Sequence, residues 1–468
     1  MKSKIRWRIF GATLFCLSVL GSLNAQSTLN VLHSFTAVPA SAPFTNSDGT
    51  FPRADLIQSG GTLYGTASQG GSSARGTIFS ININGTGFTN LHNFNGSDGG
   101  IVYGGLVLAG NTLYGTTSGS GSSSPGTIFS INTNGTGFVD LYHFTAISHL
   151  TNSDGGNPQV SLILSGNTLY GTAKSGGSSG NGTVFRINTD GSSFTNLHNF
   201  AGFPSEGSSP QGGLILLGNT LYGTTRTAGS SNNGTIFRIN TDGAGFTNLH
   251  NFAGFPSEGY SPQGSLISSG NTLYGTTFNG GISNAGTVFC IDTNGASYRT
   301  LHSFVISDGL QPVSDLFLSG NTLYGTTQYG SSPFSGNVFS MNTDGTDVKN
   351  LYNFTATLNS TNSDGASLLA GVILLGNTLY GVASQGGGTG HGTVFALGLV
   401  PALGIAPVSN QVAISWPSWA TNFGLQTTTD LFSGSWSNVT SGITTVSAGY
   451  VFTNTVNGKA AFFRLRSQ

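Results

Sequence analysis

The chain has 468 residues, of which 73 are glycine and only 7% are charged. Helices are rich in Ala, Leu, Glu, Lys and Arg, so this composition excludes a mostly helical protein. The aromatic content of 11% argues against disorder, because aromatic side chains bury enough area to offset the entropy of ordering. The composition therefore favours a large all-β protein with many tight turns.

The first 25 residues have the features of a secretory signal peptide. Four basic residues between positions 2 and 8 precede an apolar run, residues 9–23, which is shorter than the roughly 20 residues of a membrane span. Cleavage after Ala25 would lower Lys plus Arg from 15 to 11 and leave Asp plus Glu at 16, so the mature net charge becomes 11 − 16, about −5. We therefore expect a secreted or cell-surface protein with no transmembrane helix in the mature chain and no nucleic-acid partner.

A tandem repeat organises most of the chain. The string LYG occurs seven times at intervals of 50–56 residues, with its tyrosine at Tyr64, Tyr114, Tyr170, Tyr222, Tyr274, Tyr324 and Tyr380. Repeats of this length that are dense in β-forming residues are typical of propeller blades. We interpret the repeated tyrosines as packing residues.

Each repeat predicts four short strands. In the fourth repeat these are Gly213–Leu217, the run TLYGTT after a Gly-Asn turn, GTIFRIN after a Gly/Ser loop, and FTNLHNF after an Asp-Gly turn. The seventh repeat has no fourth strand, but Leu29–Phe35 before the first repeat matches one. Pairing between the two ends would close a ring of seven sheets, so we predict a seven-bladed β-propeller over residues 26–400.

The repeats differ in length at one place only, the loop that connects the fourth strand to the next repeat. In a propeller this loop lies on the same face as the Gly/Ser loop between the second and third strands. Insertions confined to one face indicate a binding face. We therefore expect a binding or adhesion module, a monomer that holds a glycan or protein ligand on this face.

Each variable loop is followed by a Ser-Asp-Gly or Ser-Glu-Gly triplet, whose acid precedes the repeat tyrosine by 16 residues. We expect these acids near the inner part of the ring. We interpret these acids as turn residues or, alternatively, as calcium ligands or direct ligand contacts. No cofactor other than calcium is suggested, and no other metal site. The candidate ligand-binding acids are Asp48, Asp98, Asp154, Glu206, Glu258, Asp308 and Asp364.

Other chemistry-bearing residues are few. Five histidines share one position in the fourth strand, where we expect edge packing. Cys290 lies in a strand pattern and is expected to be a buried, unreactive thiol. Motifs for serine hydrolases, zinc proteases and nucleotide-binding loops are absent, so no catalytic residue is assigned.

After Pro401 the repeat stops and tryptophans appear. Residues 401–468 contain strand-like runs such as QVAISW, FGLQTTT and GYVFTNTV. We predict a small β-sandwich similar to a fibronectin type III domain. Trp416 and Trp436 are expected in its core, whereas Trp419 is the candidate for an exposed ligand contact.

The repeated unit LYGTT–GG–GT[IV]F–xxxxxG–L–F resembles the Gloeo-Verruco (GloVer) tandem repeat of bacterial surface and secreted proteins, often called choice-of-anchor proteins. The resemblance covers residues 29 to about 397. It implies a secreted or surface location, and it implies no agreed activity and no catalytic residues. Two alternatives to a binding module remain: a polysaccharide-active enzyme that uses converging carboxylates such as Asp154 or Asp364, and a structural component of the cell envelope.

Overall fold

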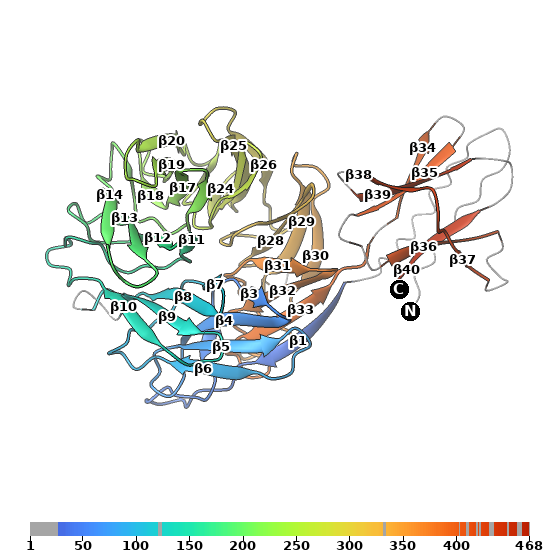
Figure 1. The fold of residues 1–468 in the computed structure, drawn as a ribbon. Helices are drawn as coiled ribbons and strands as arrows, with labels where there is room; N and C mark the ends of the chain where they lie inside the picture. Colours follow the sequence, from blue (N-terminus) through green and yellow to red (C-terminus); the bar gives the residue numbers. More distant parts are fainter. Residues whose placement is uncertain are drawn as a thin grey trace.

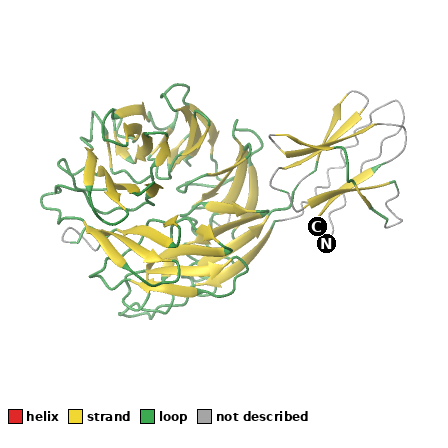
Figure 2. Ribbon diagram, viewed as in Figure 1, coloured by secondary structure: helices red, strands yellow, loops and turns green. Residues whose placement is uncertain are grey.

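The computed structural model describes residues 27–467 except 120–123, 331–333, 402, 409–410, 418–419, 421–422, 430–434, 447–448 and 456–460. The predicted signal peptide and Trp419 lie outside the described residues. The described part consists of strands, turns and loops without a helix (Figure 2). No helix in this part could span a membrane.

Seven antiparallel sheets share one strand order. The first strands are β3 (Ile57–Ser59), β7 (Val107–Ala109), β11 (Ile163–Ser165), β16 (Ile215–Leu217), β22 (Ile267–Ser269), β27 (Phe317–Ser319) and β31 (Val372–Leu375). Those labelled in Figure 1, β3, β7, β11 and β31, lie towards the centre of the repeat array. The second strands carry the LYG motif: β4 (Thr62–Gln69), β8 (Thr112–Thr117), β12 (Thr168–Ala173), β17 (Thr220–Thr225), β23 (Thr272–Thr277), β28 (Thr322–Thr327) and β32 (Thr378–Ala383).

The third and fourth strands complete each sheet. The third strands are β5 (Thr77–Asn82), β9 (Thr127–Asn132), β13 (Thr183–Asn188), β19 (Thr235–Asn240), β25 (Thr287–Asp292), β29 (Asn337–Asn342) and β33 (Thr393–Gly398). The fourth strands are β6 (Thr89–Asn93), β10 (Val139–His143), β14 (Thr195–Asn199), β20 (Thr247–Asn251), β26 (Arg299–Ser303), β30 (Lys349–Asn353) and β1 (Thr28–Ser34).

The two ends of the repeat array meet in one sheet. Strand β1 pairs antiparallel with β33, with Leu29 opposite Leu397 and Ser34 opposite Thr393. The expected contribution of the N-terminal strand to the last sheet is therefore confirmed. Three short ladders extend the loops: β2 (Thr50–Pro52) pairs with β4, β15 (Gly207–Ser208) with β18 (Thr227–Ala228), and β21 (Gly259–Tyr260) with β24 (Asn279–Gly280).

The repeated residues form the contacts between consecutive sheets. One core cluster joins Tyr64, Ile78 and Phe94 of the first repeat to Leu113 and Phe129 of the second. The repeat tyrosines are at most 8% exposed, which confirms them as packing residues. The hydroxyl of Thr326 donates to the Ala370 carbonyl of the next repeat at 2.7 Å, so polar contacts also tie neighbouring sheets together.

The glycine of LYG is required by close packing. A Cβ at Gly65 would lie 2.5 Å from Phe79 Cζ and 2.8 Å from Leu56 Cδ2. Gly65 is paired with Phe79 across β4 and β5, so the phenylalanine ring covers the glycine backbone. The glycine of LYG and the phenylalanine of GT[IV]F therefore form a cross-strand pair, in which the small residue makes room for the ring of the large one.

The C-terminal residues form two further sheets. One contains β34 (Gly404–Val408), β35 (Gln411–Pro417), β39 (Gly449–Thr455) and β38 (Ile443–Val446), and the other contains β37 (Ser437–Asn438), β36 (Phe423–Thr428) and β40 (Phe462–Ser467). Trp416 is 5% exposed in their shared core, as expected. Trp436 is half-buried, and the Arg464 guanidinium lies 4.2 Å from its ring centroid.

Candidate functional site

The seven triplet acids, which we call the rim acids, hydrogen-bond to the fourth strand of the preceding sheet. His33 Nε2 lies 2.8 Å from Asp48 Oδ2, and Tyr142 donates its hydroxyl to Asp154 at 2.7 Å. Each rim acid also accepts the backbone N–H of the first residue after the strand-end phenylalanine, as Asp154 does from Thr145 at 2.9 Å. The remaining pairs are His92–Asp98, His198–Glu206, His250–Glu258, His302–Asp308 and Tyr352–Asp364.

The rim acids therefore lie beside the fourth strands, and the expectation that they lie near the inner part of the ring is wrong. The connection turns back along the fourth strand before it enters the next repeat, so the acid meets that strand first. A sequence spacing to the second strand could not reveal this reversal. Whether these seven acids, or Trp419, contact a ligand stays a prediction.

Aromatic stacking extends these pairs from one sheet to the next. The His33 ring stacks on Phe88 of the following repeat at 3.7 Å, and Tyr142 stacks on Phe194 at 4.0 Å. Burial raises the pKa of Asp48, but hydrogen bonds from His33 and Thr36 outweigh it and lower the pKa below the usual value. Burial and the bond to Asp154 raise the pKa of Tyr142. Every rim acid thus accepts a side-chain and a backbone hydrogen bond, and in five of the seven pairs the His or Tyr ring also stacks on the following repeat.

The two loop types predicted to share a face do contact each other. Asn46, in the loop before the first triplet, accepts the N–H of Gly49 at 3.0 Å and that of Gly71 in the loop after β4 at 2.7 Å. Asn152 and Asn362 make the same pair of contacts in their repeats. The asparagine therefore holds the variable loop against the Gly/Ser loop.

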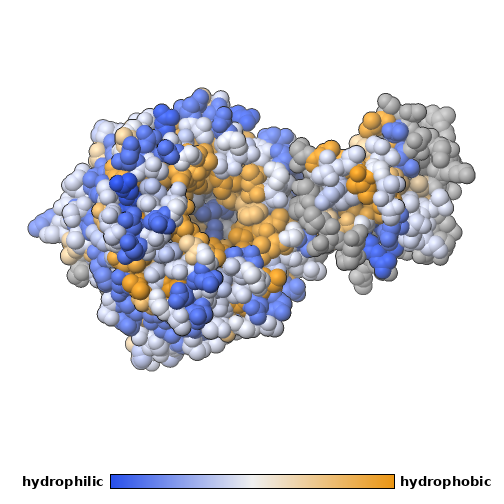
Figure 3. Space-filling model, in the orientation of Figure 1, coloured by the Kyte–Doolittle hydropathy of each residue, from blue (hydrophilic) through white to orange (hydrophobic). Residues whose placement is uncertain are grey.

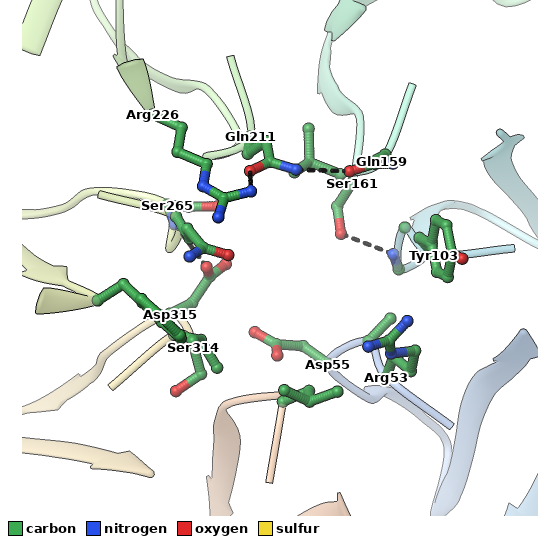
Figure 4. A pocket seen from close by; sticks show the side chains of 18 of the residues that line it. Arg53, Asp55, Tyr103, Gln159, Ser161, Gln211, Arg226, Ser265, Ser314 and Asp315 are labelled. Atoms are coloured by element: carbon green, nitrogen blue, oxygen red, sulfur yellow. Dashed lines mark hydrogen bonds between the residues drawn. The ribbon is translucent and has the colours of Figure 1, made fainter. Parts of the chain in front are cut away.

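A cavity of about 420 Å³ lies where the first strands begin (Figure 4). Figure 3 shows the hollow from one side, with apolar residues around much of its edge. The side chains come from residues that follow the variable loops, such as Arg53, and from residues after the second strands, such as Arg226 and Phe278. The central cavity is therefore built at the ends of the two loop types.

Two sets of equivalent positions line most of the cavity. The first set lies nine residues before each repeat tyrosine, and we call these the axial positions. The second set lies eleven residues before each repeat tyrosine, and we call these the mouth positions. The axial residues are Asp55, Gly105, Ser161, Gly213, Ser265, Asp315 and Gly371, and the mouth residues are Arg53, Tyr103, Gln159, Gln211, Gln263, Val313 and Leu369. All seven mouth residues and five axial residues line the cavity.

The axial side chains bond to the backbone of the neighbouring repeat. Asp55 Oδ1 accepts the N–H of Gly371 at 2.6 Å, and Asp315 Oδ1 accepts that of Ser265 at 2.5 Å. Ser161 and Ser265 accept from Gly105 and Gly213 in the same way, at 3.0 and 2.9 Å. These bonds fix each polar side chain, and the glycines allow the close approach: a Cβ at Gly105 would lie 2.6 Å from Ser161 Oγ, and one at Gly213 would lie 2.5 Å from Ser265 Oγ.

One wall presents a chain of hydrogen bonds. Arg226 donates to Gln211 Oε1 at 3.2 Å, and Gln211 Nε2 donates to Gln159 Oε1 at 2.8 Å. Each amide oxygen accepts one of these bonds and keeps a second lone pair, and the side chains of Arg226, Gln211 and Gln159 contain further N–H donors that could meet a ligand. The Arg53 guanidinium lies 5.1 Å from the centroid of the Tyr103 ring at another part of the mouth.

Asp55 and Asp315 are electrostatically unusual. Burial and the charge of Asp315 raise the pKa of Asp55 to about 8, and burial raises the pKa of Asp315 as well. Among the ion pairs of the described residues, none includes either carboxyl group. Perturbed carboxyl groups inside a cavity mark a candidate functional site. The described residues contain no group of three or more His, Cys, Asp or Glu that could hold a metal.

None of the residues of this cavity was predicted from the sequence. The predicted acidic site residues recur in each repeat, whereas the residues at the axial and mouth positions differ between repeats. The available signal was variation between repeats. In a segment whose length is constant, the axial residue is Asp, Gly or Ser in different repeats, and the mouth residue varies among types such as Arg, Gln and Leu. Cys290, by contrast, is buried in β25 as expected.

The fold and the cavity define an all-β repeat protein of β-propeller-like architecture with a ligand-sized central cavity. Overlapping stretches at residues 13–148, 52–270, 140–332 and 203–395 match the model of the Gloeobacter/Verrucomicrobia repeat. The chain therefore belongs to this repeat family. No curated protein sequence matches it.

Solved structures of similar shape share little sequence with the chain. The extracellular domain of BT4673 from B. thetaiotaomicron is 11% identical, with a TM-score of 0.47 over 87% of this chain and 47% of that one. An oligogalacturonate lyase in complex with manganese is 10% identical, with a TM-score of 0.44 over 80% and 98% of the two chains. A nidogen/laminin complex gives 17% identity and a TM-score of 0.39 over 61% and 92%.

Proposed function

We propose that this protein is a secreted carbohydrate-binding module and that its ligand enters the central cavity. In this proposal the seven sheets form a closed seven-bladed β-propeller over residues 26–400, and residues 401–468 form a fibronectin type III-like sandwich. The monomeric propeller holds the end of a glycan on the face where the variable and Gly/Ser loops meet.

The observation that carries the proposal is the lining of the cavity. Its volume of about 420 Å³ falls within the range of roughly 300–1,000 Å³ that is usual for small-ligand sites. Gln211, Arg226 and Asp55 supply planar donors and acceptors that suit the hydroxyl groups of a sugar. Tyr103 and Phe278 supply aromatic surface for the apolar face of a pyranose ring.

Calorimetric titration with soluble oligosaccharides tests the proposal. Replacement of Tyr103 by Ala or of Gln211 by Ala should weaken the binding of a bound sugar by about tenfold or more, because each removes a direct contact inside a desolvated site. Leu150→Ala is the matched control, since Leu150 is 78% exposed on a variable loop and does not line the cavity.

Two results would contradict the cavity as the ligand site. One is unchanged affinity in both cavity variants. The other is a loss of binding only when the variable loops 146–152 and 355–362 are shortened, which would place the ligand on the loops and keep the adhesion function. Absence of binding to every glycan would reject the carbohydrate class.

A second candidate function follows from the carboxyl groups. A group with a pKa of about 8, as at Asp55, carries a proton at neutral pH and could donate it to a leaving group, with Asp315 as the second carboxyl. A polysaccharide-active enzyme of this kind would release reducing ends from a substrate, and Asp55→Asn would abolish the release. Absence of turnover on a broad panel of polysaccharides would reject this candidate.

A further inference from the structure

Two carboxyl groups, those of Asp55 and Asp315, lie at the axial positions of the central cavity, and we call this part of the cavity the floor. The axial position between them is a glycine and has no side chain. Asp55 and Asp315 occupy equivalent positions in the first and sixth repeats, and the seventh repeat has Gly371 between them. A Cβ at Gly371 would already lie 3.2 Å from Asp55 Oδ2, so the absence of a side chain there is what leaves the carboxyl group accessible. Figure 4 shows both carboxyl groups at the cavity.

Each carboxyl group is held by the backbone and has no cationic partner among the residues that the structure describes. The bonds from Gly371 and Ser265 engage Oδ1 of each aspartate. The two arginines of the lining have other contacts, since Arg53 lies over Tyr103 and Arg226 donates to Gln211. Among the described residues no cationic side chain therefore stabilises the ionised form of either carboxyl group. Burial favours the protonated form and raises the pKa of both groups, whereas a bound cation would favour the ionised form.

The rest of the cavity indicates which kind of cation fits. The volume above the floor is much larger than a metal ion requires, and its aromatic and amide lining suits an organic molecule. The wall of Gln159, Gln211 and Arg226 offers N–H donors, whereas the floor offers two carboxyl groups, which a cationic donor would hold in their ionised, acceptor form. A ligand that matches both surfaces carries acceptor oxygens at one side and a donor cation at the other.

Building on the proposed carbohydrate-binding function, we propose that the sugar unit at the floor of the cavity carries a free amine, whose ammonium group binds between Asp55 and Asp315. An ammonium group donates up to three hydrogen bonds and supplies the missing positive charge, and bonds between ionised partners are about twice as strong as neutral ones. An N-acetyl group or a hydroxyl group at the same position supplies no charge.

Three disaccharides of the same linkage distinguish the outcomes: β-1,4-linked glucosamine, its N-acetylated form, and cellobiose, which has a hydroxyl group in place of the amine. At pH 6 we expect the free-amine disaccharide to bind at least about tenfold more tightly than the other two. In Asp55→Asn and in Asp315→Asn the ratio should fall towards one, because the amide keeps the backbone bond and loses the charge.

Asp347→Asn is the matched control. It removes one carboxylate from an exposed turn of the sixth repeat, where Asp347 pairs with Lys349, and it should leave the ratio unchanged. Melting temperatures of all variants show whether each is folded, and either aspartate variant alone suffices for the test.

Each other outcome has its own meaning. Equal affinity for all three disaccharides would overturn the amine proposal and leave the carbohydrate-binding function standing. Absence of binding to all three and to the wider glycan panel would overturn both. A rise in melting temperature with calcium alone that requires both aspartates would also overturn the amine proposal, because a metal ion would then neutralise the floor.

Discussion

At the residue scale, positions with the same place in each repeat divide into two kinds. Residues that recur, such as Tyr64, Phe79 and the rim acids, are buried or bonded between sheets. Residues that differ, such as Asp55 and Gln211, face the central cavity. The reason is geometric: equivalent packing positions have equivalent neighbours, whereas the proposed ligand, being asymmetric, would meet each repeat in a different way.

The raised pKa of Asp55 predicts a pH dependence of stability. The folded protein keeps this proton up to about pH 8, whereas the unfolded chain releases it near 3.8. Between these values the folded state binds more protons, so the carboxyl group makes unfolding easier as the pH rises. We expect the melting temperature of the wild type to fall relative to Asp55→Asn between pH 5 and pH 8. If the melting temperatures of the wild type and of Asp55→Asn changed equally with pH across this range, the raised pKa of Asp55 would be refuted.

The rim acids predict a stability effect that is independent of any ligand. Asp154 is 3% exposed and accepts bonds from Tyr142 and from the backbone and side chain of Thr145. Asp154→Ala should lower the free energy of unfolding by about 2–3 kcal/mol, because it leaves buried donors without acceptors. Urea denaturation measures the loss, and Asp347→Ala at an exposed turn should stay within about 0.5 kcal/mol. Equal stability of both variants would leave the rim acids without a structural role.

At the element scale, the strands were predictable and the course of the loops was not. The turn at Gly218 and the run TLYGTT predict β17 at the residues where it is found. Such a prediction is possible because a hairpin turn and the strand beside it depend on residues that are adjacent in the sequence. The loop that leads to Asp48 turns back along β1, where Asp48 contacts His33 and Thr36, 15 and 12 residues earlier, and the spacing from the acid to the next repeat tyrosine contains no information about these contacts. The inner or outer place of an acid could therefore not be read from its spacing.

The cross-strand pair of glycine and phenylalanine predicts a steric effect. A Cβ at Gly275 would lie 2.6 Å from Phe289 Cζ and 2.9 Å from Leu266 Cδ2. Gly275→Ala should therefore destabilise the protein by about 1–3 kcal/mol, as other overpacked cores do. Gly388→Ala is the control, because nothing lies within 4 Å of the added atom. Similar chemical denaturation of the two variants would mean that the phenylalanine can move aside.

At the scale of the whole molecule, several contacts link the first repeat to the last, among them a strand pairing, an axial hydrogen bond and a shared core cluster. Strand β1 pairs with β33, and Asp55 accepts the N–H of Gly371, 316 residues further along the chain. Both contacts join parts of the chain that no local pattern relates. The match of Leu29–Phe35 to a missing fourth strand was the one sequence feature that predicted this closure, whereas the axial bond required the structure.

Removal of residues 27–35 should leave the last sheet without its fourth strand. The deletion exposes the edge of β33 and uncovers its apolar residues, so we expect self-association and a lower melting temperature. Size-exclusion chromatography detects the association. A synthetic peptide of residues 27–36 should restore the monomer by pairing with β33, and a peptide with Leu29, Val31 and Phe35 replaced by Asp should not. A monomeric truncated chain of unchanged stability would contradict the closure.

The pairing of β1 with β33 also sets an order of events during synthesis. Strand β1 is among the first described residues to leave the ribosome, yet its partner is not made until residue 398 is in place. The earlier sheets can form one after another, because each second and third strand is local in the chain. We therefore expect the pairing of β1 with β33 to be the last strand pairing to form, because it closes the longest loop of the repeat array. A ribosome stalled before residue 393 would hold a row of folded sheets whose N-terminal strand is still free.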